Sequence, residues 1–253
     1  MRPFVLLVSV AALAFAVSGG PLRPQPAFAA HHLAEISEVM VGFDGNPNVQ
    51  YVEINQRDAL NQNFVQGTIL TAFGPTGSFL GVVLTVPGNV NPGLDRKWVM
   101  GTAAFETASG IQADFEFPAG PMSPVGGMVC WGGLGLTDPT NPNHYVDCVA
   151  YGTYTGTVVP SPPKTSLPAG DCQQSLTRVI PTTTFNAPNP PDGTWADGNN
   201  STDFALAAPS PQNDAGLIGT LTGLNTDGDL LNDCRDPDDD NDTINDTVDN
   251  CRL

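Results

Sequence analysis

Residues 225–253 hold the side chains best suited to chemistry: ten aspartates and two arginines, with neither lysine nor glutamate. At an offset of thirteen residues the segment divides into two units, 225–237 and 238–250. In both units oxygen-bearing side chains occupy positions 1, 3, 5, 9 and 12, and position 7 offers the backbone carbonyl of Leu231 or Ile244. The predicted metal ligands are Asn225, Asp227, Asp229, Asp233, Asp236, Asp238, Asp240, Asp242, Asp246 and Asp249.

This spacing predicts calcium binding, because Ca²⁺ prefers about six to eight hard oxygen ligands from a wrapped loop. The segment carries ten aspartates and two arginines, so its charges repel one another until cations neutralise them. Position 6, where such loops place a turn glycine, is Leu230 in one unit and Thr243 in the other. A side chain there is strained if the backbone φ is positive. The alternative is a disordered acidic tail that keeps the protein soluble.

The two units, ending in Asp249-Asn250-Cys251, resemble thrombospondin type 3 repeats. The resemblance implies Ca²⁺ as the bound cofactor in an irregular repeat tail. Extracellular calcium modules typically bind with dissociation constants of roughly 10⁻⁴ to 10⁻³ M. No helical pattern flanks the units, so an ordinary helix-loop-helix calcium hand is not expected.

The body that carries this tail reads as short strands separated by glycine and proline turns. Alternating or apolar runs of strand length occur at 34–41, 50–55, 68–73, 79–86, 97–100, 127–131 and 146–151. No segment shows sustained 3.6-residue periodicity, so an all-β fold, a β-sandwich or barrel, is predicted. The expected organisation is a signal peptide at 1–29, a β-domain at 30–216, a linker at 217–224 and the repeats at 225–253.

Several short motifs follow one another in an order that resembles secreted bacterial lamin tail domains. They are Ile36 to Met40, Tyr51 to Asn55, Gly127 to Trp131, Asp147 to Gly152, Ser175 to Arg178, Asp203-Phe204 and Pro209 to Asn213. The resemblance spans roughly residues 33–213 and implies an immunoglobulin-like β-sandwich that serves as a binding or assembly module. The proline-rich stretch from Val158 to Pro191 departs from this pattern.

The N-terminus has the three parts of a secretory signal peptide. Arg2 gives a positive start, 4–17 is almost continuously apolar, and Ala27-Phe28-Ala29 offers small residues for cleavage. The apolar run is shorter than the roughly 18 residues that a membrane span needs. We therefore expect a secreted, extracellular protein without a membrane span. The cell surface is the other location that this pattern allows. The net charge of −17 argues against nucleic acid and anionic lipid as partners.

Five cysteines agree with export, since exported chains use cysteines as bridges. Their spacing favours two local pairs, Cys130–Cys148 and Cys234–Cys251. Cys172 is then left over. It is free, takes the place of Cys130 or Cys148, or forms an intermolecular disulfide, and the spacing leaves these three fates open.

The sequence does not predict an enzyme, because it holds no Gly-x-Ser-x-Gly elbow, phosphate-binding loop or zinc-spaced Cys/His set. One catalytic alternative is a copper-dependent oxidase acting on polysaccharide. Cleavage after Ala30 would make His31 the amino terminus, and His144 would supply the second imidazole. Cleavage after Ala29 fits the small-residue rule better and leaves Ala30 at the terminus.

Two classes without catalysis remain: a calcium-binding module that holds an unidentified extracellular protein or glycan, and a purely structural surface component. Of these the binding module is favoured, with adhesion or surface assembly as its role. Trp98, Trp131 and Trp195 are expected in the core, and the alternative is a carbohydrate platform, since aromatic faces stack on sugars. Tyr51 and Glu53 share one face of a strand and are interpreted as a cross-strand aromatic and a solvated carboxylate. The alternative is a partner-binding patch.

Overall fold

The computed structural model describes residues 34–57, 62–133, 138–156, 174–179, 200–229, 233, 236–246 and 248. The predicted signal peptide, Cys172 and Asp249 lie outside the described residues. In chain order the described elements are β1 (Ala34–Met40), β2 (Tyr51–Gln56), β3 (Ile69–Phe73), β4 (Phe79–Thr85), β5 (Arg96–Gly101), α1 (Ala103–Ser109), β6 (Phe115–Glu116), β7 (Gly126–Gly132), a 3₁₀ turn (Pro142–His144), β8 (Asp147–Gly152), β9 (Ser175–Arg178), α2 (Asn200–Asp203) and β10 (Phe204–Ala207).

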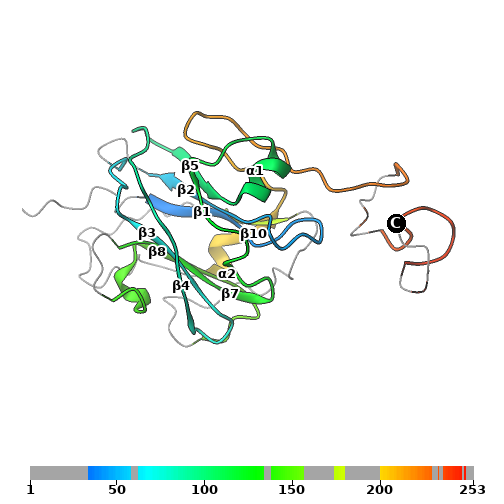
Figure 1. Cartoon of the computed structure of the whole chain (residues 1–253), viewed down its shortest axis with the longest axis horizontal. Helices are drawn as coiled ribbons and strands as arrows, with labels where there is room; N and C mark the ends of the chain where they lie inside the picture. The colour runs from blue at the N-terminus through cyan, green and yellow to red at the C-terminus, as the bar shows by residue number, and fades with distance from the viewer. Residues whose placement is uncertain are drawn as a thin grey trace, which may run out of the picture.

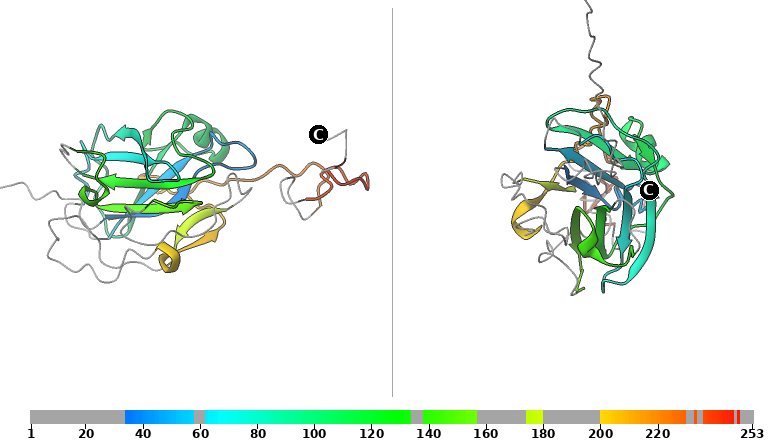
Figure 2. Two further views of the ribbon diagram at one scale, coloured as in Figure 1. Left: turned by 90° about the horizontal axis from the view of Figure 1, so that it is seen from below. Right: turned by 90° about the vertical axis from the view of Figure 1, so that its left-hand side faces the viewer.

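The strands form two sheets, which confirms the all-β prediction. The larger sheet has the order β10-β9-β1-β2-β5-β6, and the smaller has the order β4-β3-β7-β8. Every pairing is antiparallel except that of β5 with β6. Figure 1 shows the two sheets as the layers of a sandwich, with α1 beside the larger sheet. In Figure 2 the C-terminal segment, coloured orange to red, extends away from this body.

The main core fills the space between the sheets. Val52 and Ile54 of β2 point into it, and so do Val129 and Trp131 of β7. Trp98 and Trp131 are fully buried there, edge to face, with their ring centroids 5.6 Å apart. The prediction that the tryptophans belong to the core is confirmed for these two, and Trp195 lies outside the described residues.

A second cluster covers the outer face of the larger sheet, where the sequence had predicted exposure to solvent. Met40, Tyr51 and Val99 point outward from the sheet and pack against Phe105 of α1. The rings of Tyr51 and Phe105 have centroids 4.8 Å apart. Because this layer and the segment after β10 cover the face, Glu53 is fully buried. The prediction that it is a solvated carboxylate is wrong.

Helix α1 is absent from the sequence prediction, and its ends explain why it forms. Thr102 caps the N-terminus by accepting a hydrogen bond from the Phe105 backbone N–H through its hydroxyl. Gly110 ends the helix in the left-handed conformation, with φ at 72°. Only Phe105 and Ser109 are buried along its seven residues. Such a short helix leaves almost no apolar periodicity to detect.

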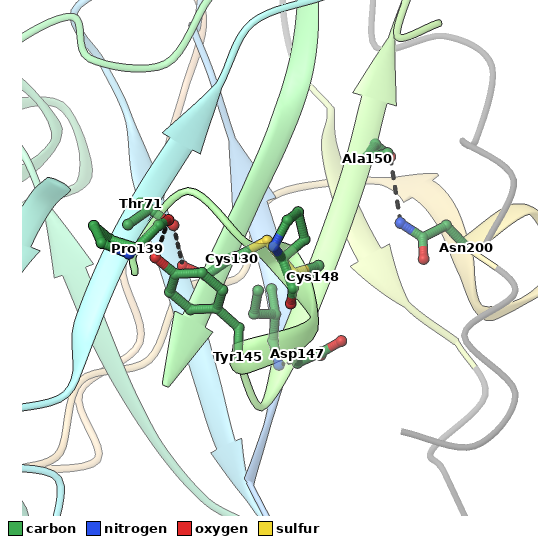
Figure 3. The surroundings of a disulfide bond; sticks show 10 residues. Thr71, Cys130, Pro139, Tyr145, Asp147, Cys148, Ala150 and Asn200 are labelled. Atoms are coloured by element: carbon green, nitrogen blue, oxygen red, sulfur yellow. Dashed lines mark hydrogen bonds between the residues drawn. A yellow bond between two sulfur atoms is a disulfide. The ribbon is translucent and has the colours of Figure 1, made fainter. Parts of the chain in front are cut away.

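One disulfide joins neighbouring strands of the smaller sheet. Cys130 of β7 and Cys148 of β8 lie opposite each other in the register and are bonded, so this predicted pair is confirmed. Figure 3 shows the bond beside Tyr145, whose hydroxyl donates to the Pro139 carbonyl at 2.8 Å. The other predicted pair, Cys234–Cys251, lies outside the described residues.

Arg178 at the end of β9 connects the two sheets through buried charges. Its guanidinium donates to Asp147 of β8 at 2.7 Å and to the Ile36 carbonyl of β1 at 2.9 Å. It also lies within ion-pair distance of Glu35 and Asp203, at 3.6 and 3.7 Å. Burial raises the pKa of Asp147 to about 6, although Arg178 acts in the opposite direction.

Candidate metal centre

The described parts of the two acidic units close their loops with the same hydrogen bonds, thirteen residues apart. In each unit the position-9 aspartate donates its backbone N–H to a carbonyl just before the unit. Its carboxylate in turn accepts the backbone N–H of position 2. The pairs are Asp233 to Leu224 (2.9 Å) and Thr226 to Asp233 (2.7 Å), then Asp246 to Pro237 (2.8 Å) and Asp239 to Asp246 (3.0 Å). The sequence repeat is thus also a structural repeat.

Both units turn sharply at position 4, where Gly228 has φ at 76° and Asn241 has φ at 55°. Glycine and asparagine tolerate this conformation better than other residues do. At position 6 of the second unit Thr243 has φ at 77°. The strain that the sequence predicted for this position is therefore present, and it is severe because threonine is β-branched.

Two groups of three carboxylates converge along the tail. Asp227, Asp229 and Asp236 form the first, and Asp238, Asp240 and Asp242 form the second. Within each group one carboxylate oxygen of each residue lies within 4.8 Å of the other two. Two oxygens bound to one Ca²⁺ at about 2.4 Å are at most about 4.8 Å apart. The spacing within each group is therefore compatible with one shared metal ion.

Not every predicted ligand joins these groups. The carboxylates of Asp233 and Asp246 accept backbone hydrogen bonds that close the loops. Asn225 uses its side-chain oxygen to accept the Gly228 N–H at 2.7 Å. Leu231 and Asp249 lie outside the described residues. Six of the ten predicted side chains thus converge in the two carboxylate groups.

Negative charge accumulates around the second unit. Desolvation, followed by the charges of Asp246 and Asp233, raises the pKa of Asp239 above its ordinary value. Its Oδ1 atom is buried without a hydrogen-bond partner among the described residues. The amide of Asn241 donates to Asp227 of the first unit and so connects the two loops. A cation is the ligand that this arrangement favours, and the all-oxygen donor set suits a hard one.

The tail begins at the body rather than after a free linker. Within 217–224, the residues that the sequence assigned to a linker, Gly219 donates to the Pro211 carbonyl at 2.8 Å and Thr220 to the Ser109 carbonyl at 3.0 Å. The backbone N–H of Leu224 donates to Asp44 at 2.9 Å. The first acidic unit is therefore attached directly beside the turn at Asp44.

The residues of the copper alternative are only partly described. His31 lies outside the described residues. His144 is exposed, and its ring nitrogens lie 3.3 Å from the Asp138 carbonyl and 3.2 Å from the Asn141 amide. These contacts fix the ring within its own loop.

In comparisons with known proteins, no family model, curated protein or solved structure matches the chain. Among the described residues no helix is both long and apolar enough to cross a bilayer. The candidate site rests on the two converging carboxylate groups of the tail.

Proposed function

We propose that the chain is a secreted, non-catalytic calcium-binding module. Its β-sandwich, of the lamin tail kind, presents a surface to an extracellular protein or glycan. Its tail, of the thrombospondin type 3 kind, binds Ca²⁺. The single observation that supports this function most strongly is the convergence of two carboxylate triplets, Asp227/Asp229/Asp236 and Asp238/Asp240/Asp242, in loops that repeat the same hydrogen bonds.

Calcium is preferred over other metals for chemical reasons. The ligands are oxygens, so zinc and copper, which favour nitrogen and sulfur, are poorly matched. Mg²⁺ requires near-ideal octahedral geometry and dehydrates reluctantly, whereas Ca²⁺ accepts irregular sets of carboxylates, carbonyls and water. The three carboxylates of each group leave several positions for carbonyl oxygens and water. Binding removes the repulsion among carboxylates and stiffens the tail into an arm.

The test is a calcium titration of the exported chain, followed by circular dichroism and by limited proteolysis of residues 225–253. We expect millimolar Ca²⁺ to change the spectrum and protect the tail, while NaCl of equal ionic strength does neither. The variant Asp240→Asn/Asp242→Asn should weaken binding at the second unit at least about tenfold, because each substitution replaces a charged ligand. Asp95→Asn, on the exposed surface of the body, is the matched control. Unchanged proteolysis in calcium rules the proposal out.

The second candidate, a structural surface component, is separated from the first by its partners. A binding module captures a protein or glycan from the native cell surface in calcium and releases it in chelator. An assembly component self-associates in calcium and captures nothing. Mass spectrometry of the exported chain tests the proposed secretion, since a mature start at Ala30 is expected.

A further inference from the structure

Two carboxylates lie side by side beneath the outer layer of the larger sheet. Glu38 of β1 and Glu53 of β2 are opposite each other in the strand register. Both are fully buried. Adjacent buried carboxylates do not both ionise readily, because each loses water and repels the other. The pair takes no part in the proposed calcium site.

The segment that covers this pair is residues 208–214, here called the strap. Every second residue of the strap, from Ser210 on, donates a backbone N–H hydrogen bond to a carboxylate. Ser210 donates to Glu38 Oε1 at 3.0 Å, Gln212 to Glu53 Oε2 at 2.8 Å, and Asp214 to Asp114 Oδ2 at 3.0 Å. The amides of these three alternate residues therefore all face carboxylates of β1, of β2 or of the residue before β6.

The other groups around the pair supply one positive charge for two carboxylates. Lys97 of β5 reaches Glu53 Oε1 at 2.8 Å, and the Ser37 hydroxyl donates to the same oxygen at 2.6 Å. From β2 and β9, the hydroxyls of Tyr51 and Ser175 donate to Glu38 Oε1.

The second oxygen of Glu38, Oε2, is buried and has no hydrogen-bond partner among the described residues. At the far end of the strap Asp214 pairs with Arg96 at 3.0 Å. This unpartnered oxygen leaves buried negative charge uncompensated beside Glu53, which favours the protonated form of Glu53.

We propose that the strap is a proton-linked latch, which closes over Glu38 and Glu53 while Glu53 holds a proton and loosens when that proton is lost. Burial, and then the charge of Glu38, raises the pKa of Glu53 to about 7. When the strap lifts, water reaches the carboxylates and the pKa of Glu53 falls toward its ordinary value of about 4.5. Rising pH between these values therefore favours the open strap.

The strap is also bonded to the residues that lead into the tail. Pro211 of the strap accepts the Gly219 N–H at 2.8 Å, and Asn213 accepts the Leu217 N–H through its side chain at 3.0 Å. Both bonds join the strap to residues 217–219, so these residues move with the strap when it lifts. The bonds of Thr220 to Ser109 and of Leu224 to Asp44 do not involve the strap and still hold the base of the tail to the body.

Amide hydrogen exchange of the full chain, followed by NMR in saturating calcium, tests the latch. After correction for intrinsic exchange rates, protection of the Ser210 and Gln212 amides should fall at least about tenfold between about pH 5 and about pH 8. Glu53→Gln should lose most of this pH dependence. Glu116→Gln, which changes an exposed carboxylate on β6, should behave like the unaltered chain. Protection that does not vary with pH, or a dependence that survives in Glu53→Gln, overturns the proposal.

A second measurement on the unaltered chain covers a failure of Glu53→Gln to fold. With ¹³C-labelled glutamate, the side-chain carboxyl of Glu53 should titrate near neutral pH, together with the chemical shift of the Gln212 amide. Titration of Glu53 near pH 4 contradicts the latch. So does titration near neutral pH that leaves the Gln212 amide unmoved.

Discussion

Thr243 is a residue at which sequence and backbone disagree. Its φ of 77° is one that β-branched side chains rarely adopt, and such strain costs about 1 to 3 kcal/mol. Thr243→Gly should relieve it. Glycine makes the unfolded chain more flexible, which offsets part of this gain. With that cost included, we expect Ca²⁺ to bind the second unit of Thr243→Gly roughly fivefold more tightly. Isothermal titration calorimetry measures the change.

The matched control is Thr222→Gly, because Thr222 is exposed, precedes the acidic units and has no positive φ. It should leave the calcium affinity unchanged. Equal effects of the two substitutions, or weaker binding by Thr243→Gly, would show that the strained φ does not limit affinity.

The sequence predicted which aspartates come together better than it predicted what each aspartate does. The thirteen-residue offset predicted six aspartates that the structure brings together. It did not show that Asp233 and Asp246 close the loops, because that role depends on which backbone N–H each carboxylate meets. Glu53 was misread for a related reason. Alternation places it on the outer face of β2, but a segment about 160 positions later in the chain covers that face.

At the scale of the elements, we expect the stability of the fold to depend strongly on Arg178 at the end of β9. Arg178→Met leaves Glu35, Asp147 and Asp203 without their shared buried cation. Removing one partner of a buried ion pair typically costs about 3 to 5 kcal/mol. We expect a loss of this size in the free energy of unfolding, measured by urea denaturation.

Arg96→Met provides the comparison, since the Arg96 side chain is 37% exposed and its pair with Asp214 is partly solvated. Pairs of that kind contribute at most about 1 kcal/mol. Similar losses for the two substitutions would mean that burial does not set the strength of the Arg178 network.

The N-terminal cap at Thr102 is the main local feature that stabilises the short helix α1. The Thr102 hydroxyl donates to the Asn48 carbonyl at 2.6 Å and accepts the Phe105 N–H at 3.1 Å. Thr102→Ala should lower the free energy of unfolding by about 1 to 2 kcal/mol, as measured by urea denaturation. Thr102→Ser, which keeps the hydroxyl, should recover most of it. If serine is no better than alanine, the methyl group rather than the cap matters.

The strands were predictable because alternation and turn residues are local, and seven strand positions follow from them. The short strands β6, β9 and β10 and the helix α1 were not, because their apolar residues acquire meaning only against distant partners. Phe105 is one example: it is a single buried aromatic in a seven-residue helix, and its neighbour Tyr51 lies on β2.

For the whole molecule, buried carboxylates make stability depend on pH in an unusual direction. The pKa values of Glu53 and Asp147 are raised to about 7 and about 6, chiefly by burial. The folded chain therefore holds protons that the unfolded chain has already released. This contribution to stability is complete below the ordinary carboxyl pKa values and is lost as pH rises through the raised ones.

Urea denaturation between about pH 4.5 and about pH 8 should show the free energy of unfolding falling, by on the order of 3 kcal/mol. The acidic tail adds to the trend only without calcium, since its repulsion is neutralised by the bound ion. Saturating calcium therefore separates the two causes: a slope that persists belongs to Glu53 and Asp147. Asp147→Asn should reduce that slope, whereas Asp95→Asn should not. Stability that rises toward pH 8 would mean that these carboxyls are ionised throughout and that their burial is offset by Lys97 and Arg178.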